Sequence, residues 1–290
     1  MNILVLSKGF IATRLTEYLI QENHTVYNFS REELDYGNKS RFFNFLEKTA
    51  IDAVVNCAGF TGKPNVDECE ARKEECFIQN SILPRDIQEV CKIKRVNLIH
   101  VSSGCIYTGY DKEYTEEDEP NFGMFDNDSS FYSKTKHAGE LNLDTDFTNI
   151  IRIRMPIEGT LDSKNLLHKL KGYNKLIDYK NSKTDVTVLC EFIETVIDDF
   201  KPGIFNAVHS NSLTTKEVIE LSKEYPLVVN PEWEFVDFED LNTKCGRSNC
   251  VLSNDKSKRV FDFDWGDEEY YIRKSFEAMS GILQEEEKQA

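Results

Sequence analysis

Short apolar runs alternate with segments of helical periodicity along most of the chain, and this alternation limits the possible folds more than any other feature. The runs with the length and apolar content of buried parallel strands are Asn2–Leu6, His24–Phe29, Asp52–Asn56, Asn97–Ser102 and Asn149–Arg154. The helical segments between them are Phe10–Gln21, Lys39–Lys48 and about Val66–Lys92, the last with a break near Asn80. This order predicts an α/β fold with a doubly wound parallel sheet of the Rossmann type.

The pattern is less regular after the fifth of these strands. We expect helices near Asn165–Leu170 and at Val186–Phe200, and a late strand at Ile204–Val208 that returns to the main sheet. The polar, acidic segment Tyr110–Ser129 predicts a loop. The tail Gln284–Ala290 contains three consecutive glutamates and predicts a frayed terminus. The last third is expected to form a smaller lobe beside the sheet.

The composition limits the partners and the compartment. The chain has 290 residues and a formal net charge of -16, so nucleic acid and anionic membranes would repel it. None of its apolar runs approaches the roughly 18 residues that a transmembrane helix needs. The 8 cysteines include no Cys-x-x-Cys pair, which predicts reduced cytoplasmic thiols rather than a metal site or a disulfide framework. We therefore expect a cytoplasmic protein that binds no metal.

A loop of small residues follows the first apolar run. Ser7, Gly9 and Ala12 stand at the three positions of the dinucleotide-binding fingerprint, with serine and alanine at the outer glycine positions. Gly9 would let the backbone approach a pyrophosphate at the N-terminus of the following helix. The fingerprint is degenerate, so the main support for a dinucleotide site is its position at the start of an alternating strand and helix pattern.

The residues after the second strand bear on the choice of cofactor. An acidic residue there would bind the ribose of NAD, whereas Ser30 and Arg31 suit the 2′-phosphate of NADP. The alternative is that Arg31 is an ordinary surface arginine. We favour the interpretation in which Arg31 binds NADP. Asp35 follows in the same loop, where it either contacts the adenine amino group or only begins a turn.

Tyr132 and Lys136 form a Tyr-x-x-x-Lys pair about thirty residues after Ser103. Four residues apart on a helix, the two side chains share one face and can point into the same cleft. A nearby ammonium favours the phenolate, so Tyr132 could pass a proton to or from a carbonyl or alcohol near neutral pH. Ser103, at the end of its strand, would hold the same oxygen with its hydroxyl.

Cys105 lies two residues beyond Ser103, at a strand end where ligand sites form in open α/β sheets. A thiol there could act as an acid or a base, although buried free cysteines are more often inert apolar groups. His168 and Lys169, on a later helix, could supply the opposing acid or base. Single residues on a helix are, however, more often solvated.

Several segments occur in an order that resembles a known family. They are Asn56–Asp67 (NCAGFTGKPNVD), Ser103–Ile106, Phe131–Lys136, Arg152–Ile157 and Arg247–Asn249. Together they resemble the bifunctional nucleotide-rhamnose epimerase/reductases of plants. Those enzymes are extended short-chain dehydrogenase/reductases related to bacterial dTDP-4-dehydrorhamnose reductase and GDP-fucose synthase. The resemblance covers roughly residues 3–260, and it extends to an asparagine- and lysine-rich version in giant DNA viruses, which implies the host cytoplasm as location.

The resemblance implies two consecutive reactions in one pocket. UDP-4-keto-6-deoxyglucose would be epimerised at C3 and C5 and then reduced at C4 by NADPH, with NADH as the alternative cofactor, to UDP-L-rhamnose. Ser103, Tyr132 and Lys136 would form the reductase triad. Cys105 and Lys169 would be the acid/base pair of the epimerase. The family also implies a homodimer.

The resemblance further implies which residues line the two ligand sites. Those implied for the cofactor are Ser7, Lys8, Gly9, Phe10, Ile11, Ser30, Arg31, Asp35, Ala58, Gly59, Tyr132, Lys136, Met155 and Pro156. Those implied for the substrate are Thr61, Asn65, Ser103, Cys105, Asn165, Arg247 and Asn249, with Arg247 on the diphosphate. The glycine loop of the family is fuller and one residue longer than the loop at Ser7, which leaves the cofactor preference open.

The domain boundaries follow from these assignments. Residues 1–157 with about 184–209 are expected to form an NADP-binding Rossmann domain. Residues from about 158–183 with 210–290 are expected to form a lobe that binds the sugar nucleotide.

Two other functions stay open: a dTDP-4-dehydrorhamnose-type reductase without epimerase activity, and a non-catalytic dinucleotide sensor. The complete set of Ser103, Tyr132 and Lys136 argues against a sensor, which needs no such triad. A 4,6-dehydratase is disfavoured, because that chemistry needs an Asp-Glu pair where Gly104 and Cys105 stand. UDP and dTDP both stay open as the nucleotide, since uracil and thymine differ by one methyl group.

Overall fold

The computed structural model describes residues 1–63, 65–225, 228, 233–241 and 243–289, so Pro64 of the family segment lies outside the described residues. Its centre is a six-stranded sheet with the strand order β10-β6-β4-β3-β1-β2. The strands are β1 (Asn2–Leu6), β2 (Thr25–Phe29), β3 (Ala53–Asn56), β4 (Asn97–Ser103), β6 (Thr148–Ile153) and β10 (Gly203–Ala207). All neighbouring pairs are parallel, which confirms the predicted doubly wound sheet, and each predicted strand ends within one residue of the observed one.

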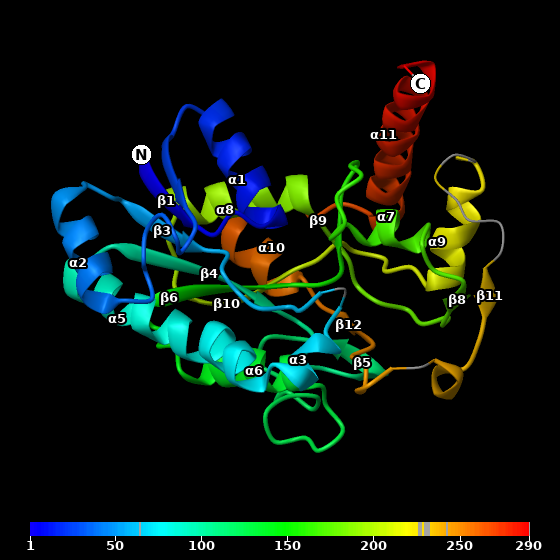
Figure 1. The fold of residues 1–290 in the computed structure, drawn as a ribbon, viewed down its shortest axis with the longest axis horizontal. Coiled ribbons are helices and arrows are strands. Elements are labelled where there is room, and N and C mark those ends of the chain that lie inside the picture. The colour runs from blue at the N-terminus through cyan, green and yellow to red at the C-terminus, as the bar shows by residue number, and fades with distance from the viewer. Residues whose placement is uncertain (64, 226–227, 229–232, 242, 290) are drawn as a thin grey trace.

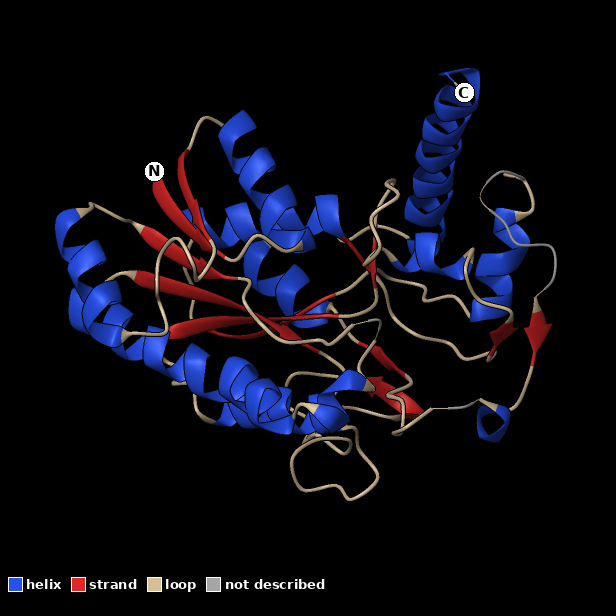
Figure 2. Cartoon of the chain, viewed as in Figure 1, coloured by secondary structure: helices blue, strands red, loops and turns tan. Residues whose placement is uncertain are grey.

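Helices cover both faces of this sheet (Figures 1 and 2). One face packs against α1 (Phe10–Gln21), α8 (Val186–Asp198) and α10 (Asp255–Phe261). The other packs against α2 (Lys39–Lys48) and α5 (Leu83–Lys94). The helices predicted from apolar periodicity at 10–21, 39–48 and 186–200 are confirmed.

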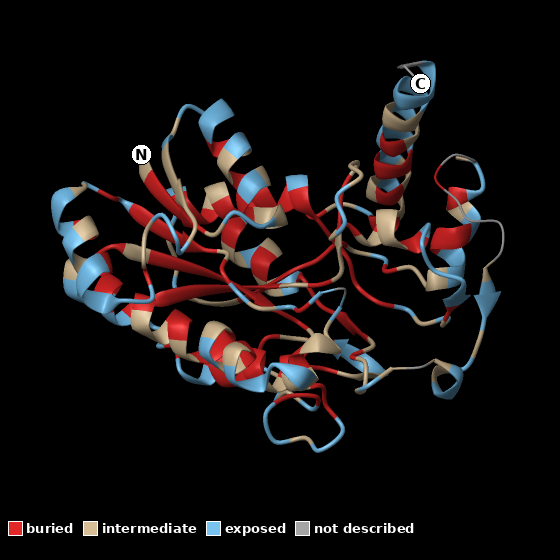
Figure 3. Ribbon diagram, in the orientation of Figure 1, coloured by how far each residue is buried: buried red, intermediate tan, exposed pale blue. Residues whose placement is uncertain are grey.

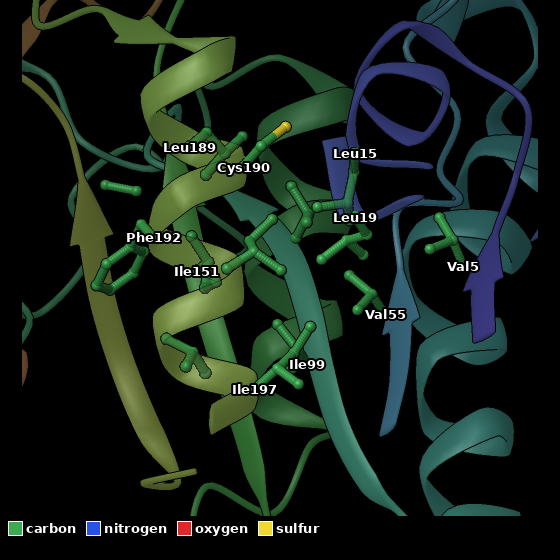
Figure 4. Close-up of a cluster of buried hydrophobic side chains, with 14 of the residues drawn as sticks. Val5, Leu15, Leu19, Val55, Ile99, Ile151, Leu189, Cys190, Phe192 and Ile197 are labelled. Carbon is green, nitrogen blue, oxygen red and sulfur yellow. The ribbon is translucent and has the colours of Figure 1, made fainter. Parts of the chain in front are cut away.

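The first strand shows why a buried parallel strand is apolar at every position. Ile3 and Val5 pack in the cluster with α1 and α8, while Leu4 and Leu6 pack on the opposite face with α2 and α5. Figure 4 shows the first of these clusters, where side chains of α8 and α1 meet those of the strands. In Figure 3 the central strands are accordingly buried, the edge strand β2 is only partly buried, and exposed residues lie on the outer sides of the helices.

The helical stretch predicted over 66–92 is divided into several pieces. α3 (Glu68–Ala71) and α4 (Lys73–Phe77) precede a π-helix, η1 (Ile78–Ile82), which leads into α5. The π-helix contains Asn80, so the predicted break is confirmed. It packs against α6 (Phe131–Leu141), where a Cβ on Gly139 would come within 2.2 Å of the Asn80 carbonyl oxygen. The wider turn and the glycine together let these elements approach closely.

The remaining elements lie mostly beside the carboxyl end of the sheet. The strands are β5 (Gly109–Tyr114), β7 (Pro156–Ile157), β8 (Lys175–Leu176), β9 (Thr184–Asp185), β11 (Glu234–Phe235) and β12 (Cys250–Leu252). They pair as β5 with β12, β7 with β9, and β8 with β11. The helices are α7 (Leu166–Leu170), α9 (Thr215–Ser222), the 3-10 helix η2 (Phe238–Asp240) and α11 (Glu268–Gln289). α7, α9 and α11 share a separate apolar cluster that includes Leu167, Val218 and Phe276.

Two predictions made for this part of the chain are wrong. The segment 110–129 begins with β5 rather than being loop throughout, because its pairing with β12 does not require apolar side chains. The tail does not fray at 284, since α11 continues to Gln289 through glutamate, glutamine and lysine, which are good helix formers. No helix in the described part of the chain combines the length and the apolar character needed to cross a membrane.

Candidate active site

The predicted site residues gather where the parallel strands end. Ser7 follows β1, Ser30 follows β2, Ser103 is the last residue of β4, and Met155 lies just after β6. Parallel strands place their carboxyl ends at one edge of the sheet, so these residues share that edge. The strand order also changes direction beside β1, which is flanked by β2 and β3, and ligands bind at such a switch point in open α/β sheets.

The Tyr132 phenol meets the Ser103 hydroxyl at the end of β4. Ser130 caps α6, since its hydroxyl accepts a hydrogen bond of 3.1 Å from the Ser133 N–H, and this puts Tyr132 in the first helical turn. Burial raises the pKa of Tyr132, negative charge on Cys105 would raise it further, and a hydrogen bond with Ser103 opposes the rise. Tyr132 is therefore a protonated phenol at neutral pH.

Lys136 lies on the same face of α6, close to the loop after β3. A Cβ placed on Gly59 would come within 3.2 Å of the Lys136 Nζ and 3.1 Å of the Asn80 Oδ1, so a side chain there would crowd both groups. Burial lowers the pKa of Lys136, while the Glu140 carboxylate opposes this change. The sequence predicted that Lys136 would lower the pKa of Tyr132. The structure reverses that direction, because burial, which disfavours the charged phenolate, is the largest influence on the pKa of Tyr132.

Asn80 of the π-helix joins the loop after β3 to α6. Its Oδ1 accepts a hydrogen bond of 2.7 Å from the Phe60 N–H. Its Nδ2 donates to the Phe60 carbonyl at 2.9 Å and to the Thr135 hydroxyl at 3.0 Å. Sequence analysis found Asn80 only as a helix break and missed this function, because the partners are distant in the chain.

Cys105 lies beside this group, and a residue that the sequence analysis did not assign contacts it. The Cys105 N–H donates to the Ser103 hydroxyl at 3.2 Å, which fixes the turn after β4. The Arg154 guanidinium donates to the Cys105 Sγ at 3.0 Å. Arg154 stands in the Arg152–Ile157 segment of the family resemblance, which was the only sequence signal that could have drawn attention to it.

The other half of the predicted acid/base pair lies on α7. Burial and the nearby Lys164 charge both lower the pKa of Lys169. Lys164 itself donates hydrogen bonds to the Thr61 hydroxyl at 3.2 Å and to the Gly62 carbonyl at 3.1 Å. In the described chain no hydrogen bond or ion pair joins Lys169 to Cys105, so the structure does not bring this predicted pair into direct contact.

Asn165 caps the start of α7, and His168 lies within the helix. The Asn165 Oδ1 accepts a hydrogen bond from the Leu167 N–H at 3.1 Å and so caps the helix, while its Nδ2 donates to the Glu158 and Thr160 carbonyls. Its amide is thus committed to the protein, which leaves Asn165 a positioning role rather than direct contact with a substrate. The Nδ1 of His168 is buried and has no hydrogen-bond partner among the described residues.

Arg247 forms an ion pair that sequence analysis did not foresee. Its Nη2 lies 2.8 Å from the Asp67 Oδ1, and the burial of Asp67 is outweighed by this pairing, which lowers the pKa of Asp67. Asn65 Oδ1 accepts from the Asp67 N–H at 2.8 Å, which holds the same turn. Asn249 accepts a hydrogen bond of 3.0 Å from Asn181. The predicted substrate residues Asn65 and Arg247 are therefore brought together through Asp67.

The loop after β1 has the backbone of a nucleotide-binding loop. Ser7 has φ of 100°, a conformation that glycine adopts far more readily, and its Oγ accepts from the Gly9 N–H at 3.1 Å. Gly9 is the N-cap of α1, and no described side chain caps the free N–H groups of the first turn, which includes Phe10 and Ile11. A Cβ on Gly9 would meet only Ser7 Oγ at 3.4 Å, so the protein itself does not require glycine there. These features fit the approach of a pyrophosphate.

An acidic residue that was not predicted lies in the loop after β2. Glu33 accepts a hydrogen bond of 2.5 Å from the Lys8 Nζ and one of 2.8 Å from the Ser30 N–H, and these lower its pKa to about 2. Arg31 is exposed in the same loop, and Asp35 forms an ion pair with Arg41. The Glu33 carboxylate thus lies close to Ser30, and Arg31 is exposed in the same loop, so a negative charge neighbours the residues predicted to bind the 2′-phosphate.

The other residues predicted for the cofactor lie along the same edge. The Ala58 N–H donates to the Asn56 Oδ1 at 3.0 Å, which shapes the turn after β3 toward Gly59. Met155 has φ of 34°, and Pro156 begins β7. A non-glycine residue in this backbone region marks local strain of the kind found at ligand sites.

Known proteins resemble this chain in sequence and in fold. Over 251 residues the chain is 31% identical to a trifunctional UDP-glucose 4,6-dehydratase/UDP-4-keto-6-deoxy-D-glucose 3,5-epimerase/UDP-4-keto-L-rhamnose-reductase of Arabidopsis thaliana. Over 207 residues it is 32% identical to a bifunctional dTDP-4-dehydrorhamnose 3,5-epimerase/dTDP-4-dehydrorhamnose reductase of the same plant. These alignments cover 81% and 67% of this chain, but only 36% and 64% of the two relatives.

The fold is similar to that of a UDP-rhamnose synthase from Acanthamoeba polyphaga mimivirus. The two structures superpose with a TM-score of 0.87 over 96% of this chain and 99% of the other, at 24% sequence identity. Residues 1–267 match the model of the RmlD substrate binding domain family. The chain belongs to that family.

Proposed function

We propose that this RmlD-family chain reduces the C4 ketone of a nucleotide 6-deoxysugar, and that the same pocket first inverts C3 and C5. The reaction sequence would convert UDP-4-keto-6-deoxyglucose to UDP-L-rhamnose. The observation that carries the reductase part is the buried interaction of Ser103 with Tyr132, with Lys136 on the same helix face, at the sheet edge that also carries the loop after β1. The epimerase part stands on Cys105 and its neighbours.

Reduction requires a ketone held in place and a proton for the resulting alkoxide. Ser103 and Tyr132 can both donate hydrogen bonds to one carbonyl oxygen, which withdraws charge from C4. When bound, NADPH supplies the hydride for C4. Because burial raises the pKa of Tyr132, its phenol is protonated at neutral pH, as a proton donor must be. The Lys136 ammonium then stabilises the phenolate that remains after the transfer.

We assign the cofactor to residues 1–157 and about 184–209, and the sugar nucleotide mainly to 158–183 and 210–290. The N-terminus of α1 at Gly9 would hold the pyrophosphate. Arg31 would pair with the 2′-phosphate, which favours NADPH over NADH. Met155 and Pro156 would border the nicotinamide.

Epimerisation uses the same ketone. The C4 carbonyl acidifies the protons on C3 and C5, since the carbanion formed is an enolate. Ser103 and Tyr132 would stabilise the enolate oxygen as an oxyanion hole does. Cys105 lies close to this pair, and Lys169, whose pKa burial and Lys164 lower, is available on the lobe side. One oxygen-binding pair would thus suffice for both reactions, and a reductase alone would use the same pair.

The part of the substrate site proposed for the nucleotide is built around the diphosphate. Arg247 would bind the diphosphate, and Asp67 holds its guanidinium until the substrate arrives. We choose UDP over dTDP because the plant relative that aligns with 81% of this chain is a UDP-4-keto-sugar epimerase and reductase. We also propose that the protein is a homodimer and lies in the cytoplasm. Analytical ultracentrifugation would test the dimer.

The decisive experiment combines product analysis with isotope exchange. The protein is incubated with NADPH and with either UDP-4-keto-6-deoxyglucose or its dTDP counterpart, and the product stereochemistry is determined by NMR. We expect UDP-L-rhamnose, formed faster than dTDP-L-rhamnose. In heavy water without cofactor, deuterium should enter at C3 and C5. Reduction without any exchange would leave a reductase only, and absence of both would refute the proposed function.

A variant separates the two activities. Cys105→Ala should stop the deuterium exchange, because it removes the thiol that is proposed to move the proton. The same variant should still reduce a ketone that has already been epimerised. Equal loss of both activities would contradict this division of labour.

A further inference from the structure

Two buried arginines lie at the carboxyl end of β6, and they have different kinds of partner. Arg152 forms an ion pair with the Glu140 carboxylate, with an Nη2–Oε2 distance of 2.7 Å. Arg154, two residues later, is 1% exposed and forms no ion pair with a carboxylate among the described residues. A buried charge without a partner of opposite sign costs free energy. The role of Arg154 is therefore not that of one half of an ion pair.

The Arg154 guanidinium joins three separate segments of the chain. Its Nη1 donates to the Ser248 hydroxyl at 2.9 Å and to the Cys105 Sγ at 3.0 Å. Its Nη2 donates to the Ser248 carbonyl at 3.2 Å and to the Asn181 Oδ1. A guanidinium holds its N–H donors in a planar fork, so one side chain reaches all these acceptors at once. Arg154 thus ties the end of β6 to the turn after β4 and to the segments that contain Asn181 and Ser248.

The segment Arg247–Asn249 depends on side-chain contacts for its position, because it belongs to no helix or strand. Ser248, its middle residue, is buried and accepts two hydrogen bonds from Arg154. Asn181, which Arg154 also holds, donates through its Nδ2 to the Asn249 Oδ1 at 3.0 Å. Two consecutive residues of the segment are therefore fixed by one buried guanidinium, directly for Ser248 and through Asn181 for Asn249.

Arg247 lies between two closely packed neighbours. On one side, the Ser248 hydroxyl donates to the Tyr107 carbonyl at 2.5 Å. On the other side, a Cβ on Gly246 would come within 2.5 Å of the Asp128 carbonyl oxygen, so the backbone there packs against another loop. The Arg247 side chain itself is 23% exposed. The backbone that carries Arg247 is thus held on both sides, while its side chain stays accessible.

We propose that Arg154 is a positioning residue for the substrate diphosphate, and that it acts by fixing Ser248 and thereby the backbone of Arg247. This inference rests on the proposed function, in which Arg247 binds the diphosphate. A binding group on a mobile backbone must be ordered when the ligand arrives, and this ordering reduces the affinity. Arg154 fixes the segment before the substrate binds, so that cost is avoided.

Binding of UDP, which carries the diphosphate but no ketone, tests the inference without the reaction. Isothermal titration of the full chain with UDP is compared with titration with NADPH. Arg154→Gln should weaken UDP binding about tenfold and change NADPH binding by less than about twofold. Equal UDP affinity in the native protein and the variant would overturn this inference alone. Absence of UDP binding in the native protein would overturn the proposed substrate as well.

A double-mutant cycle shows whether Arg154 acts through Arg247. In the Arg247→Met background, Arg154→Gln should weaken UDP binding by less than about a further twofold, because the group that it positions is already absent. A further loss of about tenfold would mean that the two arginines act independently, and would overturn the inference. Parallel losses of UDP and NADPH affinity in Arg154→Gln would show a general effect on the fold and would also overturn it.

Arg154→Lys separates the geometry of the guanidinium from its charge. A lysine keeps the positive charge but cannot bridge Ser248 and Asn181, so UDP binding should weaken about as much as in Arg154→Gln. Native-like UDP binding in Arg154→Lys would assign the effect to charge and contradict the inference. Should Arg154→Gln fail to fold, Ser248→Ala removes one of the contacts and should weaken UDP binding about threefold with native NADPH binding. Unchanged UDP binding in Ser248→Ala would then overturn the inference.

Discussion

The two walls of the proposed pocket differ in how firmly the protein holds them. On the sheet side, Ser103, Tyr132 and Lys136 are buried on β4 and α6. On the lobe side, Lys169 and Arg247 are only partly buried and lie on a five-residue helix and an irregular segment. Groups that must meet a reacting atom benefit from a rigid wall. The difference fits a division in which the sheet wall would hold the ketone and the lobe wall would recognise the sugar nucleotide, with Lys169 as the one proposed proton donor on the lobe side.

The largest effect is expected on the sheet wall. Tyr132→Phe removes the proton donor while keeping the ring in its apolar surroundings of Cys69 and Cys76. The rate of ketone reduction should fall about 10³-fold, within the range typical of a lost general acid. Stopped-flow absorbance of NADPH measures the rate, and fluorescence titration should give unchanged NADPH binding. A rate within tenfold of the native enzyme would mean that another group supplies the proton.

The lobe wall should respond in binding rather than in rate. Arg247→Met removes the group proposed to hold the diphosphate, so KM for the nucleotide sugar should rise about 10–100-fold, as for a lost charged hydrogen bond. The kcat should change little. Asp67→Asn is the matched control, since it frees Arg247 from its ion pair and should lower KM or leave it unchanged. A fall in kcat with constant KM for Arg247→Met would show that Arg247 acts on the rate of the reaction and not on substrate binding, contrary to the proposed difference between the two walls.

The loop after β2 should set the cofactor preference by a smaller factor. Arg31→Ala should weaken NADPH binding about tenfold and leave NADH binding unchanged, since only NADPH carries the 2′-phosphate. Glu33→Gln removes the carboxylate that pairs with Lys8 and should shift the preference toward NADPH. Isothermal titration with both cofactors measures these effects. Equal losses for NADPH and NADH in Arg31→Ala would place the 2′-phosphate elsewhere.

The smallest effect concerns the pH dependence on the lobe wall. As an acid, Lys169 must carry its proton, so deuterium exchange at C3 and C5 should fall as the pH rises through its lowered pKa. Lys164→Gln removes a charge that lowers this pKa, so the falling limb should move to higher pH. Lys164→Arg keeps the charge and should leave the limb in place. An unmoved limb in Lys164→Gln would mean that Lys169 is not the group that titrates.

The sheet could be predicted from the sequence because burial on both faces makes most positions of its central strands apolar. Ile3–Leu6 shows this, since neighbouring residues fill clusters on opposite faces. β5 could not be found in this way, because its side chains are largely exposed. The helix at the chain end was missed for a related reason, since its charged residues stabilise a helix without a continuous apolar stripe.

Within the site, single residues could be predicted but their pairings could not. Tyr132 and Lys136 lie four residues apart, so helical spacing alone placed them together. Asp67 with Arg247 and Cys105 with Arg154 are separated by 180 and 49 positions, and no local pattern links them. The sign of the Tyr132 pKa shift was also missed, because burial depends on the whole fold.

The central proposal is that Ser103 and Tyr132 hold the sugar ketone beside the nicotinamide. The most direct test follows the hydride itself. NADPH deuterated at C4 of the nicotinamide is mixed with UDP-4-keto-6-deoxyglucose, and the product is examined by NMR and mass spectrometry. We predict deuterium at C4 of UDP-L-rhamnose, with about a 10³-fold slower appearance in Tyr132→Phe. A product without deuterium at C4, or one formed equally fast by Tyr132→Phe, would contradict the account.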